Sequence, residues 1–213
     1  MRSYGSDVLR PLLLIALALL TACGPRVAPV PESARGQTPR TAPTSPWQGR
    51  GRLELVAPGK RISCGAIVRG LGDGSARVAF ISDEGLLLAD LSLKPGAWET
   101  ITAIADLKDA LPHLGRLAAQ AFAAAPMEER HWQDNAIAAS AGDQVRWYGG
   151  DPVLLRAVTG GGLDLLLEDW RMLGTELVPC EVRGEGPFGI TIRIRLDPLS
   201  LKMGSTGASS PRP

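Results

Sequence analysis

Alternation of apolar and polar residues limits what this chain can fold into more than any other feature of its sequence. The clearest case is the segment 190–196, where Ile190, Ile192, Ile194 and Leu196 alternate with one threonine and two arginines. A period of two residues is typical of a β-strand that turns one face to the core. The first half of the chain carries the same signal in 52–55, 61–69, 76–80 and 86–93, with a fifth candidate in 98–105.

The second half of the chain contains another block of strand candidates. They are 135–141, 144–149, 153–158, 163–172, 176–183 and 190–196. The triple glycine at 160–162 suits a hairpin turn that needs positive φ angles. The pair Glu168-Asp169 interrupts an apolar run and shifts its parity, which indicates a bulge. We therefore expect antiparallel strands in two blocks.

Between the two blocks the apolar period changes to three or four residues, which predicts an amphipathic helix over about 109–124. The residues that form its apolar face are Leu107, Leu111, Leu114, Leu117 and Ala121. His113, Arg116 and Gln120 take the other face. Asp109 is positioned to cap the helix. The predicted fold class is α+β: one strongly curved antiparallel sheet, an open half-barrel, with the helix across its concave face.

Residues 1–22 have the pattern of a signal peptide. Arg2 and Arg10 precede a short apolar run at 11–20, which is about half the length that a membrane-spanning helix needs. The run ends in Leu20-Thr-Ala-Cys23. This tetrapeptide resembles the lipobox of bacterial lipoproteins, in which the cysteine is acylated and becomes the new N-terminus. The alternative is an ordinary signal peptide with a cysteine near the cleavage site by chance.

The sequence divides the remaining chain into three parts. Residues 23–46 contain six prolines after Cys23 and few large apolar side chains, which predicts an extended linker with a reach of about 60–70 Å. Residues 47–203 form the predicted domain. Residues 204–213, rich in glycine, serine and proline, form a predicted disordered tail.

The charge balance excludes two classes of partner. Removing residues 1–22 lowers Lys+Arg from 23 to 21 and Asp+Glu from 22 to 21, which leaves the mature chain close to neutral. Nucleic-acid binding by charge needs a basic patch or stripe. Anionic lipids are held in the same way by polybasic segments. We therefore expect no nucleic-acid partner, and a membrane attachment that depends on the lipid anchor.

Two cysteines remain once Cys23 carries lipid. Cys64 and Cys180 are an even pair in a compartment that permits disulfides, so a bridge between them is favoured. The alternative is two unpaired thiols that behave as small buried apolar side chains. Neither cysteine has a histidine at metal-ligand spacing, so no metal site is expected.

The sequence offers no established catalytic motif. It has neither a Gly-x-Ser-x-Gly elbow nor a phosphate-binding Walker loop. Its paired acids are Asp83-Glu84, Glu128-Glu129 and Glu168-Asp169. Adjacent carboxylates on a strand point to opposite faces, so these pairs are interpreted as structural. His113 lies on the polar face of the predicted helix and is expected to be exposed, and His131 shows no acid or nucleophile partner. We expect no catalytic residues, no cofactor and no enzymatic activity.

The apolar residues that alternation places on the inner face form the only candidate site. A lining of this kind would bind acyl chains better than sugars or nucleotides, because apolar burial supplies the binding energy at about 25 cal/mol per Å². The alternative is that the same residues are a packed core without a cavity. The candidate lining is Leu53, Leu55, Val68, Val78, Phe80, Leu87, Leu91, Leu155, Leu165, Leu167, Ile192 and Ile194, with Leu111, Leu114 and Leu117 of the helix as its lid.

The order of strands, helix and returning strands is similar to the LolA/LolB superfamily of periplasmic lipoprotein carriers. The local stretches that carry the resemblance are Gly51-Arg-Leu-Glu-Leu55 after Trp47, Gly85–Asp90, Leu177-Val-Pro179 and the alternation of 190–196. The resemblance implies a half-barrel, lidded by helices, that binds acyl chains. The receptor of that family inserts lipoproteins through a protruding loop with an exposed leucine. The corresponding turn here, 82–85, is short and acidic.

Two functional hypotheses follow. The first is a non-enzymatic, lipid-anchored envelope protein that binds an acyl chain or a lipidated protein and aids its localisation. Gly24 after the cysteine favours the outer membrane, facing the periplasm, by the sorting rule of bacterial lipoproteins. The second hypothesis is a tethered accessory subunit that stabilises a secretion, pilus or other envelope assembly through protein contacts.

Overall fold

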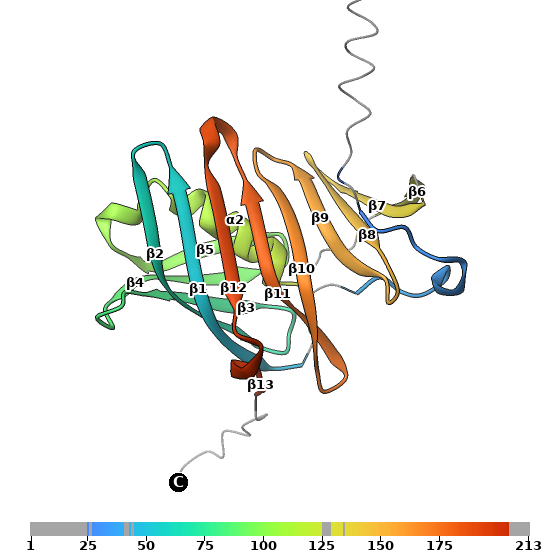
Figure 1. The fold of residues 1–213 in the computed structure, drawn as a ribbon, viewed down its shortest axis with the longest axis horizontal. Helices are drawn as coiled ribbons and strands as arrows, with labels where there is room; N and C mark the ends of the chain where they lie inside the picture. Colours follow the sequence, from blue (N-terminus) through green and yellow to red (C-terminus); the bar gives the residue numbers. More distant parts are fainter. Residues whose placement is uncertain are drawn as a thin grey trace, which may run out of the picture.

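Most of the described residues form one curved antiparallel sheet that does not close on itself (Figure 1). The computed structural model describes residues 25, 27–40, 43, 45–124, 129–133 and 135–204. Thirteen strands of these residues form the sheet, in the order β5-β4-β3-β2-β1-β12-β11-β10-β9-β8-β7-β6, with β13 beside β1. Strands β5 and β6 lie at its two ends. The described residues also form a helix of three turns, so the domain is α+β, as the sequence predicts.

The first half of the sheet is a meander in which each strand pairs with the next along the chain. Its strands are β1 (Trp47–Ala57), β2 (Lys60–Gly70), β3 (Ala76–Ile81), β4 (Leu87–Lys94) and β5 (Ala97–Ala103). Alternation works as expected in β3, where Ala76, Val78 and Phe80 are buried and the residues between them are not. The predicted block of four strands and a fifth is confirmed.

The second half is also a meander. Its strands are β6 (Glu129–Gln133), β7 (Ala136–Ala141), β8 (Gln144–Gly149), β9 (Leu154–Gly160), β10 (Asp164–Leu173), β11 (Glu176–Glu185), β12 (Thr191–Leu196) and the short β13 (Lys202–Met203). The sequence did not predict β6, because its polar residues show no apolar alternation. Glycines 160–162 all have positive φ angles, as the predicted turn requires.

The two meanders meet where β1 pairs with β12 in the middle of the sheet. Their register runs from Gly51↔Leu196 to Val56↔Thr191. Within it Leu53 faces Ile194, and both side chains are fully buried. The strand pair that joins the two halves is therefore also part of the core.

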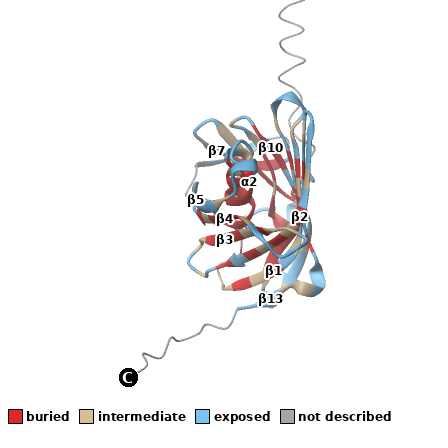
Figure 2. Ribbon diagram, turned by 90° about the vertical axis from the view of Figure 1, so that its left-hand side faces the viewer, coloured by how far each residue is buried: buried red, intermediate tan, exposed pale blue. Residues whose placement is uncertain are grey.

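The helix α2 (Leu111–Phe122) packs against β3, β4, β5 and β11, which belong to both halves of the sheet. Figure 2 shows most of α2 in the colour of buried residues. The expected cap is absent, because Ala110 occupies the N-cap position and no side chain bonds there. Gln120, expected on the polar face, is buried as well.

The described chain also contains short 3-10 turns of three residues each. They are η1 (Glu32–Ala34), η2 (Ala105–Leu107), η3 (Pro187–Gly189) and η4 (Pro198–Ser200).

The structure differs from the predicted linker over residues 27–40, which contact the second meander at several points. Val30 and Ala34 are buried, with 3% and 1% of their surface exposed. Arg40 exchanges two backbone hydrogen bonds, of 2.9 and 3.0 Å, with the chain at the start of β9. Two small apolar side chains and backbone pairing anchor this segment, and neither gives a periodic signal. The signal peptide with Cys23, and the tail from 205 onward, lie outside the described residues.

The predicted bulge at Glu168-Asp169 takes a different form. Asp169 has a left-handed backbone with φ of 48°. The pairs Glu168↔Glu181 and Trp170↔Pro179 keep one continuous register on either side of it. The change of side-chain parity in β10 therefore comes from one unusual backbone angle and not from an inserted residue.

Candidate functional site

The predicted apolar lining lies in one buried cluster that includes α2. All of its members except Leu87 are buried: Leu53, Leu55, Val68, Val78, Phe80, Leu91, Leu111, Leu114, Leu117, Leu155, Leu165, Leu167, Ile192 and Ile194. Leu87 is 46% exposed. The pairing of β3 with β4 shifts its register between Phe80 and Ile81. Counting every second residue back from Leu91 therefore assigns Leu87, at the start of β4, to the wrong face. Alternation thus identifies inward positions correctly until a bulge intervenes.

Close contacts fill the space between α2 and the strands. A Cβ added at Gly184 of β11 would lie 2.7 Å from Leu117 Cδ1, and one added at Gly115 of α2 would lie 2.2 Å from the Trp98 ring. Glycines therefore occur where helix and sheet approach most closely. Of the two alternatives that the sequence left open, these close contacts and the burial of the cluster favour the packed core.

A pocket of about 220 Å³ opens beside the N-terminal end of α2. It is lined by Leu55, Ala57, Pro58, Lys60, Asp106, Asp109, Ala110, His113 and Ile190. Leu55 and Ile190 connect it to the core, while Lys60 Nζ donates a hydrogen bond to the Asp106 carbonyl at its rim. Ligand pockets usually occupy about 300–1,000 Å³. We call this pocket the mouth, since it reaches the core but is smaller than a binding cavity.

The first turn of α2 lies at the mouth and contains Pro112, which suits a helix start, but it has neither a side-chain cap nor an acidic residue. Helix starts without these features leave their backbone N–H groups poorly satisfied. The other end of α2 is held more firmly, because Gln120 Nε2 donates a 2.6 Å hydrogen bond to Gln144 Oε1 of β8. Sequence reasoning missed this contact, which joins the helix to the second meander.

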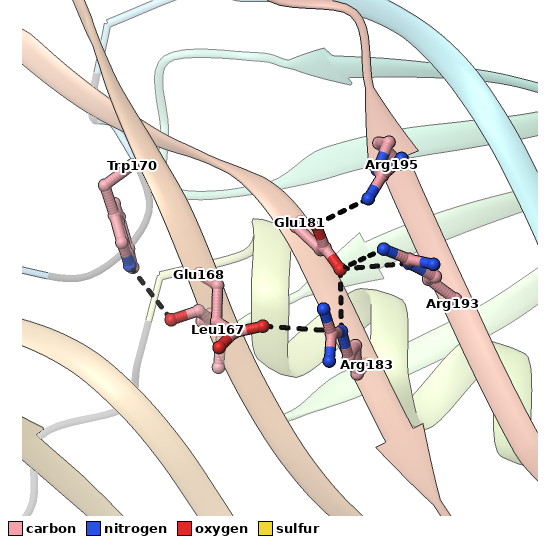
Figure 3. Close-up of polar contacts among 7 residues, drawn as sticks. All are labelled: Leu167, Glu168, Trp170, Glu181, Arg183, Arg193 and Arg195. Atoms are coloured by element: carbon pink, nitrogen blue, oxygen red, sulfur yellow. Dashed lines mark hydrogen bonds and ion pairs between the residues drawn. The ribbon is translucent and has the colours of Figure 1, made fainter.

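An ion-pair cluster lies on the face of the sheet opposite the core (Figure 3). Glu181 Oε1 accepts hydrogen bonds from Arg183 Nε at 2.6 Å and Arg193 Nε at 2.9 Å. Arg195 Nη2 donates to Glu181 Oε2 at 3.2 Å. Arg183 also pairs with Glu168, with 3.4 Å between Nε and Oε2. These contacts join β10, β11 and β12 side by side.

The electrostatics of the cluster follow from its geometry. Desolvation alone would raise the pKa of the Glu181 carboxyl, but the hydrogen bonds from the three arginines outweigh it and lower that pKa to about 2. Glu168 takes part in these contacts, and Asp169 pairs with Arg171 at 2.7 Å. These ion pairs agree with the interpretation of Glu168-Asp169 as a structural pair. Alternation placed Arg193 and Arg195 outward, but nothing singled out Glu181.

The structure contradicts the predicted disulfide. Cys64 of β2 and Cys180 of β11 are both free and buried. Strands β1 and β12 lie between them. Three strand spacings of about 4.8 Å separate the cysteines by roughly 14 Å, twice the greatest Cα separation that a disulfide spans. Burial raises the pKa of both thiols, that of Cys180 to about 11.

The other candidate side chains in the described part of the chain are not grouped as a metal site or a catalytic site would require. Its histidine, cysteine and acidic side chains form no group of three that could hold a metal ion. His113 is half-buried at the mouth, and His131 is exposed on β6. The acidic turn at 82–85 is followed by Leu86, which is 67% exposed. No helix among the described residues has the length and apolar character to cross a membrane.

Comparison with known proteins identifies the architecture. No family model matches the chain, and no curated protein sequence matches it. A crystal structure of a LolA superfamily protein from Nitrosomonas europaea is similar, with a TM-score of 0.51 and 12% identity, over 77% of this chain and 88% of that one.

Two further solved structures are similar at lower scores. A domain named for outer membrane lipoprotein sorting, from Vibrio parahaemolyticus, has a TM-score of 0.46 and 9% identity over 80% of this chain and 89% of that one. A DUF1329 family protein from Desulfovibrio piger has a TM-score of 0.42 and 10% identity over 78% and 88%. The fold predicted from the resemblance is confirmed: the described chain has a fold similar to that of the LolA superfamily protein from Nitrosomonas europaea.

Proposed function

We propose that this chain is a lipid-anchored protein of the bacterial cell envelope that binds an acyl chain, free or attached to a protein, inside its half-barrel. The observation that carries the proposal is the interior itself: apolar residues of both meanders converge on α2 within a LolA/LolB-like fold. The protein acts as a carrier or receptor and not as an enzyme. By binding its cargo it aids the localisation of lipoproteins or lipids.

The chemistry of the interior selects the ligand. The buried polar or charged residues of the described chain are Asp90, Gln120, Arg146 and Glu181, and Glu181 lies on the opposite face in the ion-pair cluster. A sugar or nucleotide would leave most of its polar groups without hydrogen bonds in such an interior, at a cost of about 1–3 kcal/mol each. An acyl chain has no such groups, and each buried CH₂ contributes about 0.8 kcal/mol.

Because the interior is filled, binding requires α2 to move. The helix lies across the concave face and acts as a lid. The movement starts at the mouth, where the first turn of α2 is uncapped, while the Gln120–Gln144 hydrogen bond holds the far end. The acyl chain then replaces helix side chains such as Leu114 and Leu117 against the strands. Such lid motions are common where a ligand must be shielded from water.

Cys23 supplies the membrane anchor in this proposal. Acylation of its sulfur, directed by Leu20-Thr-Ala-Cys23, holds the domain on the outer membrane facing the periplasm. The charge balance of the mature chain supports an anchor of this kind, since no excess of basic residues is available to hold anionic lipids.

The decisive experiment is binding of a fluorescent fatty acid to the full chain purified from membranes. We expect saturable binding of an NBD-labelled fatty acid, competed by unlabelled palmitate, and lipid in native mass spectra. Ala57→Trp, which blocks the mouth, should weaken binding about tenfold or more. Leu199→Trp, at a side chain 92% exposed, is the matched control and should leave it unchanged. A chain that neither retains lipid nor binds the probe contradicts the proposal.

The second candidate function is a tethered accessory subunit of an envelope assembly. One observation favours it: the core is filled in this conformation, as expected for a domain that works through its outer surface. Crosslinking in cells distinguishes the two. A single protein partner trapped in place of lipid, together with absence of fatty-acid binding, would favour the accessory subunit.

A further inference from the structure

Three hairpin turns lie along one edge of the sheet, at the top of Figure 1. They connect β1 to β2, β9 to β10 and β11 to β12, which are neighbours in the sheet. We call the turns 58–59, 161–163 and 186–190 the hairpin edge. The mouth opens at this edge, because Pro58, Lys60 and Ile190 line it.

The turn between β11 and β12 presents an aromatic side chain to solvent. Phe188 is 88% exposed and has a left-handed backbone, with φ of 58° and ψ of 26°. This conformation is uncommon for a residue other than glycine, asparagine or aspartate, and least of all expected for a bulky one. The fold thus holds a large apolar ring at the tip of the turn, where nothing in the described chain covers it.

The described chain begins at the same edge. Pro25 lies beside Thr159, Asp164 and Glu185, at the upper ends of β9, β10 and β11. Cys23 precedes Pro25 by two residues, which span at most about 7 Å when extended. Residues 27–40 are attached to the second meander through Val30 and Arg40, so they do not serve as a spacer. A lipid on Cys23 therefore holds the hairpin edge close to the bilayer surface.

We propose that the hairpin edge faces the lipid bilayer and that Phe188 inserts among the lipids there. The bilayer is then in contact with the mouth, so that an acyl chain passes between membrane and interior without crossing water. This inference rests on the anchor at Cys23 in the proposed function. The opposite end of the domain also exposes apolar side chains, Leu199 and Met203, but Pro25 lies at the hairpin edge.

Because both ends of the domain expose apolar side chains, the same label placed at each end gives a matched test. Phe188→Cys and Leu199→Cys, each made in the full chain, place one reactive thiol in a 3-10 turn at opposite ends of the domain. Cys64 and Cys180 are buried, and Cys23 has no free thiol when acylated, so an NBD maleimide labels the new cysteine. Unmodified chain treated with the same reagent gives the background. Both labelled chains are reconstituted into vesicles of phosphatidylethanolamine and phosphatidylglycerol that contain doxyl-labelled lipid.

We expect the NBD group at position 188 to shift its emission to the blue and to be quenched about threefold more strongly than the group at 199. Equal quenching at both positions, stronger quenching at 199 or none at 188 would overturn the inference. Mass spectrometry of the same preparations reports acylation of Cys23, and an unmodified Cys23 would overturn it too. Fatty-acid binding in solution is measured separately, so loss of the membrane contact is distinguishable from failure of the proposed acyl-chain binding.

Discussion

Gly115 of α2 lies so close to Trp98 of β5 that a Cβ atom at position 115 would be 2.2 Å from the indole ring. The contact joins the helix to the outermost strand of the first meander. Any added atom must displace either the ring or the helix. The pair therefore controls how closely α2 seats on the sheet.

Gly115→Ala should lower the free energy of unfolding. Alanine favours a helix by about 1 kcal/mol over glycine, but overpacking in a core costs about 1–3 kcal/mol, so the net loss is expected to be up to about 2 kcal/mol. Urea unfolding followed by circular dichroism measures it. Combining Gly115→Ala with Trp98→Leu removes the clash, and the substitution should then cost less than it does alone. Strictly additive effects in this double-mutant cycle would contradict the proposed contact.

Glu181→Gln should destabilise the domain at neutral pH by about 1–3 kcal/mol, because hydrogen bonds from three charged arginines lose their charged acceptor. The folded-state pKa of Glu181 is about 2, below its ordinary value of 4.5. Its stabilising contribution is therefore complete above pH 4.5 and disappears as the pH falls toward 2. Denaturant unfolding between pH 6 and 2.5 should show the two curves converging. Glu99→Gln, at an exposed carboxylate of β5, is the control and should show no comparable difference.

The thiols of Cys64 and Cys180 should react slowly with Ellman's reagent in the folded protein. Both are buried, and burial raises the pKa of each, so little thiolate is present at pH 8. In denaturant both should react at once. Intact mass measured without reductant should show no loss of two hydrogens. Fast reaction in the native state, or a mass 2 Da lower, would contradict the arrangement of β2 and β11.

Val30→Ser should destabilise the whole domain, because Val30 is buried against the second meander. The expected loss is about 1–2 kcal/mol, near that of removing a buried valine side chain. Val56→Ser, at a valine 38% exposed, is the matched control and should have a smaller effect. Limited trypsin digestion gives a second measurement. Cleavage after Arg40 should be slow in the unmodified chain and faster in Val30→Ser, whereas rapid cleavage in both would restore the linker interpretation.

Strands such as β12 and β3 could be predicted because their buried residues alternate without interruption. Strand β6 could not, since all of its residues except Trp132 are polar and its position depends on pairing with β7. The segment 27–40 was missed for a similar reason. Its anchoring depends on backbone hydrogen bonds and on Val30 and Ala34, which are too few to form a pattern.

The residues of the candidate site also divide into those that a local pattern predicts and those that depend on contacts between distant parts of the chain. Inward positions such as Leu53 and Ile194 follow from local alternation, but Leu87 depends on a register shift that no local pattern encodes. The disulfide between Cys64 and Cys180 was predicted only because two cysteines remain after Cys23. The distance between them depends on which strands lie between β2 and β11, and the sequence does not show that order. Whether the interior is open or filled depends on the volumes of side chains that meet only in the folded chain, such as Leu117 and Gly184.

The first meander needs the last part of the chain to complete its backbone pairing, because β1 pairs with β12. Gly51 and Leu196 are partners, so closing this ladder joins points about 145 residues apart, and the entropy lost in closing that loop opposes the pairing. Until the two strands pair, one edge of β1 has unpaired backbone groups. Such an edge is a template for association with other chains. Chains truncated before β12 should therefore aggregate, although their first meander is complete.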